Sequence, residues 1–194
     1  MGSGKLIVIA APSGCGKTTI AKAILMKYPA MLFSVSATTR PIRDGEINGK
    51  DYFFLTKAEF EERIRIGDLV EWEEIYGNYY GTLKSEIDRA LQQGYGMLFD
   101  VDVKGALSIR QHFPNDSVLI FINPPSFEIL KKRLEDRNTE NPDTLKRRLE
   151  RVPMEMEQGR QFDFQVINDD LQKAVNEVDE IVRTNKKDHR TSHS

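Results

Sequence analysis

A glycine-containing stretch at residues 11–19 constrains this chain more than any other feature. It reads A-P-S-G-C-G-K-T-T, follows an apolar run at residues 6–10 and precedes a helical pattern of apolar residues. A strand, a glycine-rich turn and a helix in this order form a loop whose backbone N–H groups bind phosphate. Lys17 adds a positive charge, and Thr18 offers the hydroxyl that such loops present to magnesium. The sequence therefore predicts a phosphate-binding loop, with Ala11 where the strict motif has glycine.

Five short apolar segments alternate with helical patterns along the chain. The apolar segments lie at residues 6–10, 33–37, 97–100, 118–122 and 164–167. Helices are expected near residues 16–28, 85–93, 104–112, 126–137 and 171–183. Strands that alternate with helices favour a parallel sheet covered by helices on its faces. We therefore expect an α/β protein with a five-stranded parallel sheet core, built from residues 5–33, 86–136 and 159–184 and followed by a polar tail at 185–194.

The alternation of strands and helices is interrupted at residues 34–85 by a segment of different composition. It is polar and rich in aromatic residues, and its elements are short: a strand near 51–55, a helix near 56–66 and a strand-like stretch at 69–75. The chain then passes through G-N-Y-Y-G-T at residues 77–82. We expect this segment to be an inserted, substrate-binding subdomain of mixed α/β structure.

The composition excludes several classes of protein. The 194 residues are 39% hydrophobic and 30% charged, and 28 Lys and Arg face 30 Asp and Glu. A net charge of −2 supplies no global positive field, so we expect no nucleic-acid partner. Neither a long apolar run nor a signal-peptide pattern argues for a membrane. The single Cys15 cannot form an internal disulfide, and a cytoplasmic setting is expected.

Two aspartates follow the apolar segment at residues 97–99. Asp100 closes that strand at its carboxyl end, where open α/β sheets bind ligands. There it is placed to hold a magnesium hydration shell beside Thr18. Asp102 points to the same face if the chain stays extended. The alternative for both aspartates is a capping role for the helix that starts near Lys104.

Six arginines gather in two parts of the chain. Guanidinium groups bind phosphate oxygens in pairs, and they supply much of the charge stabilisation in phosphoryl transfer. A phosphate role is favoured for four of them, namely Arg40, Arg43, Arg137 and Arg148. For the other two, Arg133 and Arg147, a solvated helix face with i,i+4 ion pairs is favoured.

Glu71 lies beside Trp72 in an otherwise apolar, strand-like context. A carboxylate there can accept two adjacent hydrogen bonds from guanine, whereas adenine lacks both donors on that edge. Hydroxyl-bearing neighbours in the same segment are Ser36, Tyr52, Tyr80 and Thr82. Spacing alone leaves the ligand of these residues open.

Other common site chemistries are missing from the sequence. The three histidines show no metal-ligand spacing, and one cysteine cannot make a zinc site. No Ser, His and carboxylate set suggests acyl transfer. A phosphate oxygen is already an anion and needs no general base, so the missing base is consistent with a nucleotide acceptor.

Taken together, the motifs resemble those of the guanylate kinases, which transfer a phosphoryl group from ATP to GMP. The matching stretches run in the family's order from about residue 5 to residue 183. They are A-P-S-G-C-G-K-T, S-V-S-A-T-T-R-P-I-R, G-E-I-N-G-K-D-Y, V-E-W, G-N-Y-Y-G-T, F-D-V-D-V-K-G, P-P-S, K-K-R-L-E-D-R-N-T-E and V-I-N-D-D-L. The set is specific, although no single stretch is.

The resemblance implies a P-loop nucleotide kinase that moves the γ-phosphoryl group of ATP to GMP or dGMP with Mg²⁺. It implies a GMP-binding subdomain at residues 34–85 and a mobile helical lid at 137–158, in which Pro142 starts the second helix. The substrates would be ATP and GMP, while the oligomeric state, monomer or homo-oligomer, stays open.

Site residues follow from the matched positions. The implied ATP-binding residues are Ala11, Pro12, Ser13, Gly14, Cys15, Gly16, Lys17, Thr18, Thr19, Asn168 and Asp169. The implied GMP-binding residues are Ser36, Arg40, Arg43, Tyr52, Glu71, Tyr80, Thr82, Asp100 and Asp102, with the division of roles between the two aspartates left open. Magnesium would be held, through water, by Thr18 and Asp100. The implied catalytic residues are Lys17, Arg43, Arg137 and Arg148.

Two other functions compete with the kinase, and one residue has two readings. An interaction module of this family would bind phosphorylated partners in the GMP site, but such modules usually lose the loop lysine or the lid arginines. A sugar-phosphate kinase would keep the loop and lack Ser36, Glu71 and Thr82.

Cys15 lies at a helix N-terminus near Lys17, where a thiol pKa can fall, so one hypothesis is that its alkylation blocks ATP. The other is a small residue at a variable loop position.

Overall fold

A computed structural model describes residues 5–75, 77–136 and 142–185 of the chain. Its first sheet has the strand order β2-β7-β1-β8-β9, and all neighbouring pairs are parallel. The strands are β1 (Leu6–Ala10), β2 (Leu32–Phe33), β7 (Met97–Asp100), β8 (Ser117–Asn123) and β9 (Phe164–Ile167). The predicted five-stranded parallel sheet is thus confirmed. Because β1 is the central strand, the glycine-rich loop that follows it opens at the middle of the sheet's carboxyl edge.

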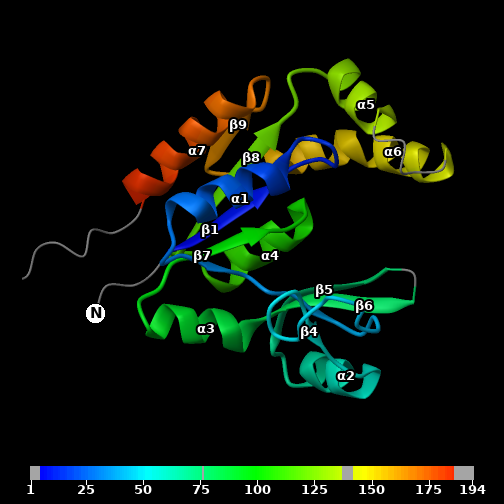
Figure 1. Ribbon diagram of the computed structural model, residues 1–194, viewed down its shortest axis with the longest axis vertical. Coiled ribbons are helices and arrows are strands. Elements are labelled where there is room, and N and C mark those ends of the chain that lie inside the picture. Colours follow the sequence, from blue (N-terminus) through cyan, green and yellow to red (C-terminus); the bar gives the residue numbers. More distant parts are fainter. Residues whose placement is uncertain (1–4, 76, 137–141, 186–194) are drawn as a thin grey trace, which may run out of the picture.

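Helices cover both faces of this sheet (Figure 1). They are α1 (Lys17–Lys27), α3 (Lys84–Gln92), α4 (Val103–His112), α5 (Phe127–Glu135) and α7 (Leu171–Asn185). In β1, Ile7 and Ile9 pack with α1 and α7, whereas Leu6 and Val8 pack with α3 and α4. All five residues of β1 are buried. A strand buried on both faces needs a continuous apolar sequence, which explains the run that the sequence shows.

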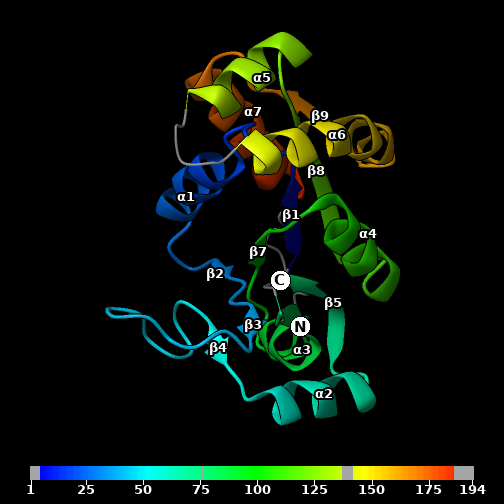
Figure 2. The ribbon, with the colours of Figure 1, turned by 90° about the vertical axis from the view of Figure 1, so that its right-hand side faces the viewer.

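A second, mixed sheet has the strand order β4-β3-β6-β5. Its strands are β3 (Ala37–Thr38), β4 (Phe53–Phe54), β5 (Leu69–Ile75) and β6 (Asn78–Leu83). Helix α2 (Lys57–Arg65) begins with a capping box between Thr56 and Glu59 and packs Phe60 into this sheet's small core. Figure 2 shows this sheet and α2 as a separate body below the first sheet.

One expected element of this region was wrong. The predicted strand at residues 33–37 is two strands in two sheets, because the Ser34 amide makes its hydrogen bond to Leu98 of the first sheet before Ala37 pairs in the second. Residues 78–83, to which the sequence assigned no element, form strand β6, paired with β5. Gly81 permits this close pairing: a Cβ there would lie 2.7 Å from the carbonyl oxygen of Glu71.

Helix α6 (Pro142–Gly159) begins at Pro142, as predicted, where a missing N–H costs no helical hydrogen bond. Its second half packs on the first sheet, since Val152 is buried there and a Cβ on Gly159 would lie 2.5 Å from Cζ of Phe121. Within the described ranges, no helix has the length and apolar character that crossing a bilayer requires. The segment bounds 34–85 and 137–158 remain predictions.

Candidate active site

The glycine-rich loop turns sharply from β1 into α1. Gly14 has a φ of +92°, and Gly16, the N-cap residue of α1, has a φ of +81°. A Cβ on Gly14 would lie 2.9 Å from Cδ2 of Leu134 in α5, so this position has no room for a side chain. The turn leaves the N-terminus of α1 open, with its first N–H groups available to an anion.

Asp100, at the end of β7, contacts both polar residues of this helix start. Its Oδ1 forms an ion pair with Nζ of Lys17, and its Oδ2 accepts a 2.7 Å hydrogen bond from Oγ1 of Thr18. The Lys17 ammonium also donates to the carbonyl oxygen of Val101 at 2.8 Å. Parallel pairing of β7 with β1 places Asp100 opposite Ile9, one residue short of the loop. The structure therefore brings the predicted residues Lys17, Thr18 and Asp100 together.

Asn168 ties the end of β9 to the loop. Its Nδ2 donates to the carbonyl oxygen of Cys15 at 2.7 Å, and a Cβ on Gly16 would lie 2.5 Å from that same nitrogen. Asn168 is 5% exposed, so this hydrogen bond is shielded from water. The glycine at position 16 is thus required both by its backbone conformation and by the amide that crosses it.

A pocket of about 410 Å³ lies beside this contact. Its lining is shared by the loop, α5 and the segment after β9: Gly14, Gly16, Thr19, Arg133, Asp136, Asn168, Asp169 and Leu171. The expectation that Arg133 lies on a solvated helix face was wrong. Arg133 Nη2 donates to the carbonyl oxygen of Asn168 at 3.0 Å, because α5 passes directly over the loop. The sequence did not predict this contact, because Arg133 lies among polar residues of a helix and its partner Asn168 lies 35 residues further along the chain.

Cys15 does not have the environment of a reactive thiol. It is 1% exposed, and burial raises its pKa to about 12, an effect that Arg133 opposes and Glu155 reinforces. The expectation of a lowered thiol pKa was therefore wrong, and burial of Cys15 favours the other hypothesis, a small residue in the loop. The cause is that the Cys15 side chain points into the core around α1 rather than toward the helix N-terminus.

Of the arginines assigned to the lid, Arg148 reaches the loop. Its Nη1 donates to Oγ of Ser13 at 2.7 Å, which connects α6 with the residues before Gly14. Arg137 lies outside the described residues, as does the side chain of Arg147. The structure thus places one of the two predicted lid arginines at the phosphate-binding loop.

A second pocket, of about 350 Å³, lies between β5 and the start of α4. Its lining residues are Leu69, Val70, Glu71, Trp72, Glu73, Asp102, Lys104, Gly105 and Ser108. Glu71 Oε1 accepts a 2.7 Å hydrogen bond from Oγ1 of Thr82, which is itself 1% exposed. Burial raises the pKa of Glu71; Thr82 opposes this shift, and the charges of Asp102 and Glu73 add to it.

Asp102 caps helix α4, the alternative role that the sequence offered for it, and also lines the second pocket. As N-cap of α4, it accepts a 2.7 Å hydrogen bond from the Gly105 amide through Oδ1. It also lines the pocket that contains Glu71. Gly105 allows this approach, since a Cβ there would lie 3.2 Å from Oδ1 of Asp102 and 3.4 Å from Cγ of Glu71.

Among the remaining predicted residues of this part, Tyr52 and Tyr80 lie close to Arg40. The Arg40 guanidinium donates 2.7 Å hydrogen bonds to Glu46 and to the Pro41 carbonyl, and it lies 5.4 Å from the centre of the Tyr52 ring. The Tyr52 and Tyr80 rings meet edge to face with centroids 6.2 Å apart. Ser36 and Arg43 take part through their backbones: the Ser36 carbonyl accepts from Phe53, and the Arg43 amide donates to Glu46.

Glu46 is a site residue that the sequence reasoning missed. It binds the Arg40 guanidinium through Oε1 and the Arg43 amide through Oε2. These hydrogen bonds, with Arg40 first, lower the pKa of Glu46, and the hydrogen bond to Glu46 raises the pKa of Arg40. The signal for it was its position in a turn three residues after Arg43.

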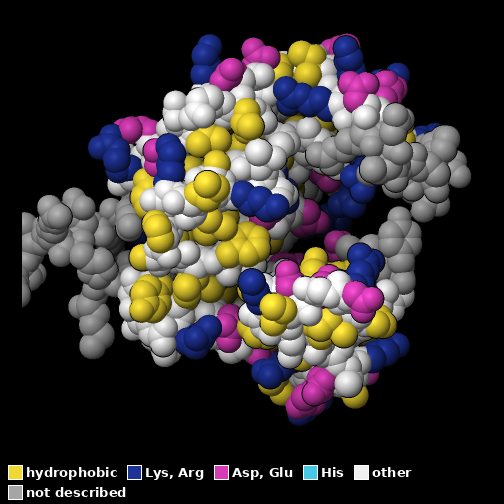
Figure 3. All heavy atoms as spheres, in the orientation of Figure 1, with side chains coloured by type: hydrophobic (Ala, Val, Ile, Leu, Met, Phe, Trp, Pro, Cys, Tyr) yellow, Lys and Arg dark blue, Asp and Glu magenta, His cyan; other side chains and the backbone are white. Residues whose placement is uncertain are grey.

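The two bodies of the molecule are separated by a hollow on one face. Figure 3 shows it between the part built on the first sheet and the part built on the second, with acidic and basic side chains at its edge. Residues 100–102 join its two sides: Asp100 contacts the phosphate-binding loop, and Asp102 lines the Glu71 pocket.

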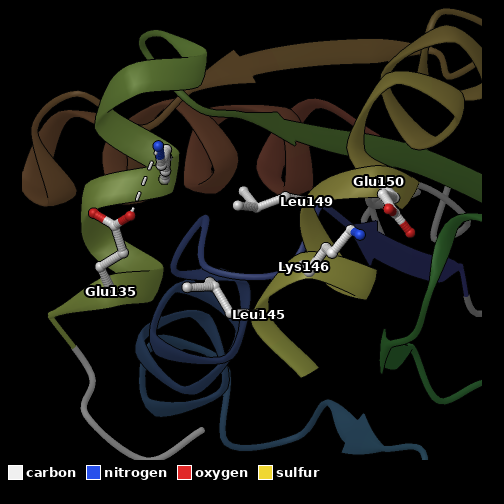
Figure 4. A pocket seen from close by; sticks show the side chains of 6 residues that line it. Glu135, Leu145, Lys146, Leu149 and Glu150 are labelled. Carbon is white, nitrogen blue, oxygen red and sulfur yellow. Dashed lines mark ion pairs between the residues drawn. The ribbon is translucent and has the colours of Figure 1, made fainter. Parts of the chain in front are cut away.

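A third pocket, of about 380 Å³, separates α5 from the first turns of α6. Leu145 and Leu149 point from α6 toward α5, where Glu135 forms a 3.9 Å ion pair with Lys131 (Figure 4). The same two leucines pack against the core cluster that includes Leu130 and Leu134. Leu130 and Leu134 also lie close to Gly14, so the same two side chains pack against both α6 and the loop.

Comparison with known proteins identifies the family of this arrangement. The sequence profile of the guanylate kinase family matches residues 3–185. A guanylate kinase of Chlorobium luteolum is 49% identical over 175 residues, 90% of this chain and 89% of that protein. A guanylate kinase of Chlorobium chlorochromatii is 50% identical over 177 residues, 91% of this chain and 93% of that protein.

A solved structure agrees with these sequences. The crystal structure of guanylate kinase from Anaplasma phagocytophilum superposes with a TM-score of 0.73 at 29% identity, covering 97% of this chain and 89% of that one. Fold and sequence thus agree along nearly the whole chain, and the chain belongs to the guanylate kinase family.

Proposed function

We propose that this protein transfers the γ-phosphoryl group of ATP to GMP, giving ADP and GDP. The observation that carries the proposal is the placement of residues 100–102. Asp100 contacts Lys17 and Thr18 of the phosphate-binding loop, and Asp102, two residues on, lines the pocket that contains Glu71. A phosphoryl donor at the loop and an acceptor in the Glu71 pocket therefore share one wall.

ATP is assigned to the loop and the pocket beside Asn168. Lys17 and the open N–H groups of the loop and of α1 bind the phosphates. Residues of the 410 Å³ pocket, with Arg133 and Asn168 among them, receive the nucleoside. The remaining loop residues, from Ala11 to Thr19, and Asp169 complete the donor side.

Magnesium is assigned to Thr18 and Asp100. A hydroxyl and a carboxylate whose oxygens lie 2.7 Å apart offer the oxygen ligands that this ion prefers. Among the described residues, no group of three His, Cys, Asp or Glu side chains forms a complete metal site, which fits an ion that is held partly by nucleotide phosphates. When bound, the ion neutralises charge on the phosphates of ATP.

GMP is assigned to the second sheet and the Glu71 pocket. Glu71 is the acceptor for the guanine N–H groups, with Thr82, Ser36 and Asp102 around it. Its hydrogen bond from Thr82 holds the carboxylate in one orientation. For the GMP phosphate the proposed ligands are Arg40, Arg43, Tyr52 and Tyr80.

The chemistry needs positioning and positive charge rather than a base. A GMP phosphate oxygen is already an anion, and it attacks the γ-phosphorus of ATP while the bond to the bridging oxygen of ADP breaks. Charge on the transferred group is stabilised by Lys17, Arg43, Arg137 and Arg148. Because Arg148 already reaches Ser13 of the loop, little movement of α6 brings it to the phosphates.

A coupled assay with ATP and magnesium tests this proposal against GMP, dGMP, AMP, CMP and UMP. GMP and dGMP are expected to be phosphorylated, and AMP to be turned over at least about 100-fold less efficiently because it cannot satisfy Glu71. Equal turnover of AMP would overturn the proposal. Binding of GMP without any turnover would favour an interaction module instead of an enzyme. The contacts of Asp100 with Lys17 and Thr18 argue against such a module. The proposed setting is cytoplasmic.

A further inference from the structure

Arg151, on α6, lies between two carboxylates that belong to different parts of the site. Its Nη2 is 3.7 Å from Oδ2 of Asp102, and its Nε is 3.4 Å from Oε1 of Glu155. Asp102 follows β7 and Glu155 lies one turn along α6, so the guanidinium connects the α6 helix with the core of the protein. None of the motifs in the sequence pointed to this residue.

The two carboxylates have different surroundings. Asp102 lines the Glu71 pocket. Glu155 is only 9% exposed; burial raises its pKa, Arg151 opposes that shift, Asp102 adds to it, and Lys17 opposes it. Glu155 is therefore close enough to Lys17 for their charges to interact. Arg151 lies between Glu155 and Asp102.

Several carboxylates lie close together in the pocket that contains Glu71. Glu71, Glu73 and Asp102 line one pocket, and burial together with the charge of Asp102 raises the pKa of both glutamates. Arg151 and Lys104 supply the opposing charge for Glu73. Lys104 belongs to α4 itself, so Arg151 is the cation that α6 contributes to this cluster.

The two oxygens of Asp102 have different surroundings. Oδ1 accepts the hydrogen bond from the Gly105 amide, whereas Oδ2 faces Arg151. A guanidinium at Oδ2 limits rotation of the carboxylate and offsets its repulsion from Glu71 and Glu73. The orientation of Asp102 in the pocket thus depends on a side chain from α6.

We propose that Arg151 is a positioning residue for the acceptor nucleotide, which holds Asp102 in the guanine pocket and couples the position of α6 to GMP binding. This inference rests on the proposed function, because it takes the Glu71 pocket as the GMP site. Arg151 acts through Asp102 and does not itself contact the substrate. Its removal should therefore weaken GMP binding and leave ATP binding unchanged.

The test compares Arg151→Gln with Arg160→Gln, a control one residue beyond the end of the same helix. Arg160 is 77% exposed and pairs with Glu157. GMP affinity is measured without ATP from the fluorescence of Trp72, the single tryptophan, which adjoins Glu71 in the same pocket. We expect R151Q to raise the Kd and KM for GMP about fivefold, the scale of a partly exposed ion pair, with the KM for ATP unchanged. R160Q should change neither constant, and Arg151→Lys should recover part of the loss.

Two outcomes overturn the inference. If R151Q behaves like R160Q, Arg151 is a surface residue, although the proposed function stands. If R151Q weakens GMP binding equally in wild type and in an Asp102→Asn background, the two residues are not coupled and the mechanism is wrong. Loss of the proposed function would look different, because Glu71→Gln and Asp102→Asn would then leave GMP binding unchanged.

Discussion

Oγ1 of Thr82 donates a 2.7 Å hydrogen bond to Oε1 of Glu71 across the β5–β6 pair, where the two residues face each other in register. Thr82 is almost fully buried, so it holds the carboxylate in one orientation inside the protein. A carboxylate fixed in this way is prepared to accept hydrogen bonds from a ligand at little further entropic cost.

Glu71→Gln should therefore impair the use of GMP much more than the use of ATP. An amide in place of the carboxylate presents a donor to the guanine N–H groups, so we expect kcat/KM for GMP to fall about 100-fold with the KM for ATP within about twofold. Steady-state kinetics with each substrate varied in turn measure both constants. Unchanged GMP kinetics would remove Glu71 from the base site.

The same substitution should stabilise the fold at neutral pH. Burial raises the pKa of Glu71, so the native state binds its proton more tightly than the unfolded chain does. The free energy of unfolding therefore falls as pH rises from the ordinary glutamate range through the raised pKa. An uncharged glutamine escapes this penalty, and we expect its Tm to be about 2–4 °C higher at pH 7, for about 1 kcal/mol. A lower Tm would show that the charge of Glu71 is compensated.

GMP binding should depend on pH in the opposite sense. Only the ionised form of Glu71 accepts from both guanine donors, and its raised pKa moves protonation to a higher pH than for an exposed glutamate. The KM for GMP should rise as pH falls through that raised pKa, while Glu71→Gln should flatten this limb. A profile that is identical in the two proteins would contradict the assignment.

Gly16→Ala should damage the ATP side. A Cβ there meets Nδ2 of Asn168 at 2.5 Å and strains a backbone with a φ of +81°. Gly67→Ala is the matched control, because Gly67 has a φ of +71° with nothing within 4 Å of the added Cβ. Both should lose about 1–2 kcal/mol of stability from backbone strain. Gly16→Ala alone should also raise the KM for ATP, about tenfold or more. Equal effects on ATP would mean that the Asn168 contact is unimportant.

Cys15 should resist alkylation in the native protein. With a pKa of about 12 and 1% exposure, it presents almost no thiolate to a reagent at pH 8. Mass spectrometry after treatment with iodoacetamide should show modification only in denaturant, with activity retained in its absence. Rapid stoichiometric labelling with loss of ATP use would restore the earlier hypothesis.

Arg148→Met should lower turnover more than nucleotide binding. Charge near the transferred group acts chiefly in the transition state, so kcat should fall about 100-fold or more with both KM values within about threefold. Ser13→Ala, which removes the hydrogen-bond partner of Arg148 and no charge, should retain most of kcat. A loss confined to KM would place Arg148 in ground-state binding instead.

The core of the fold and the phosphate-binding loop could be predicted from the sequence because they depend on local patterns. The continuous apolar sequence of β1 predicts a buried strand, and the glycines at positions 14 and 16 permit the positive φ angles of the loop. Strand β6 was not predicted, because its close pairing depends on the missing side chain at Gly81, where a Cβ would meet the carbonyl oxygen of Glu71 on the neighbouring strand.

Individual site residues show the same limit. The pairing of Thr18 with Asp100 followed from the rule that parallel strands end at one edge. The role of Arg133 and the burial of Cys15 did not, because both depend on how α5 and α1 pack around the loop. Arg151 lies outside the matching stretches. Glu46 lies within G-E-I-N-G-K-D-Y, but its hydrogen bonds to Arg40 and to the Arg43 amide depend on how this loop folds.

The hydrogen bond from Asn168 to the Cys15 carbonyl spans 153 residues of sequence. The glycine-rich loop leaves the ribosome before this partner is made. A nascent chain lacking β9 thus carries the complete loop motif without the amide that supports it. Competence to bind ATP is therefore expected to arise only when the edge strand joins β8, so that a chain without β9 does not capture the nucleotide.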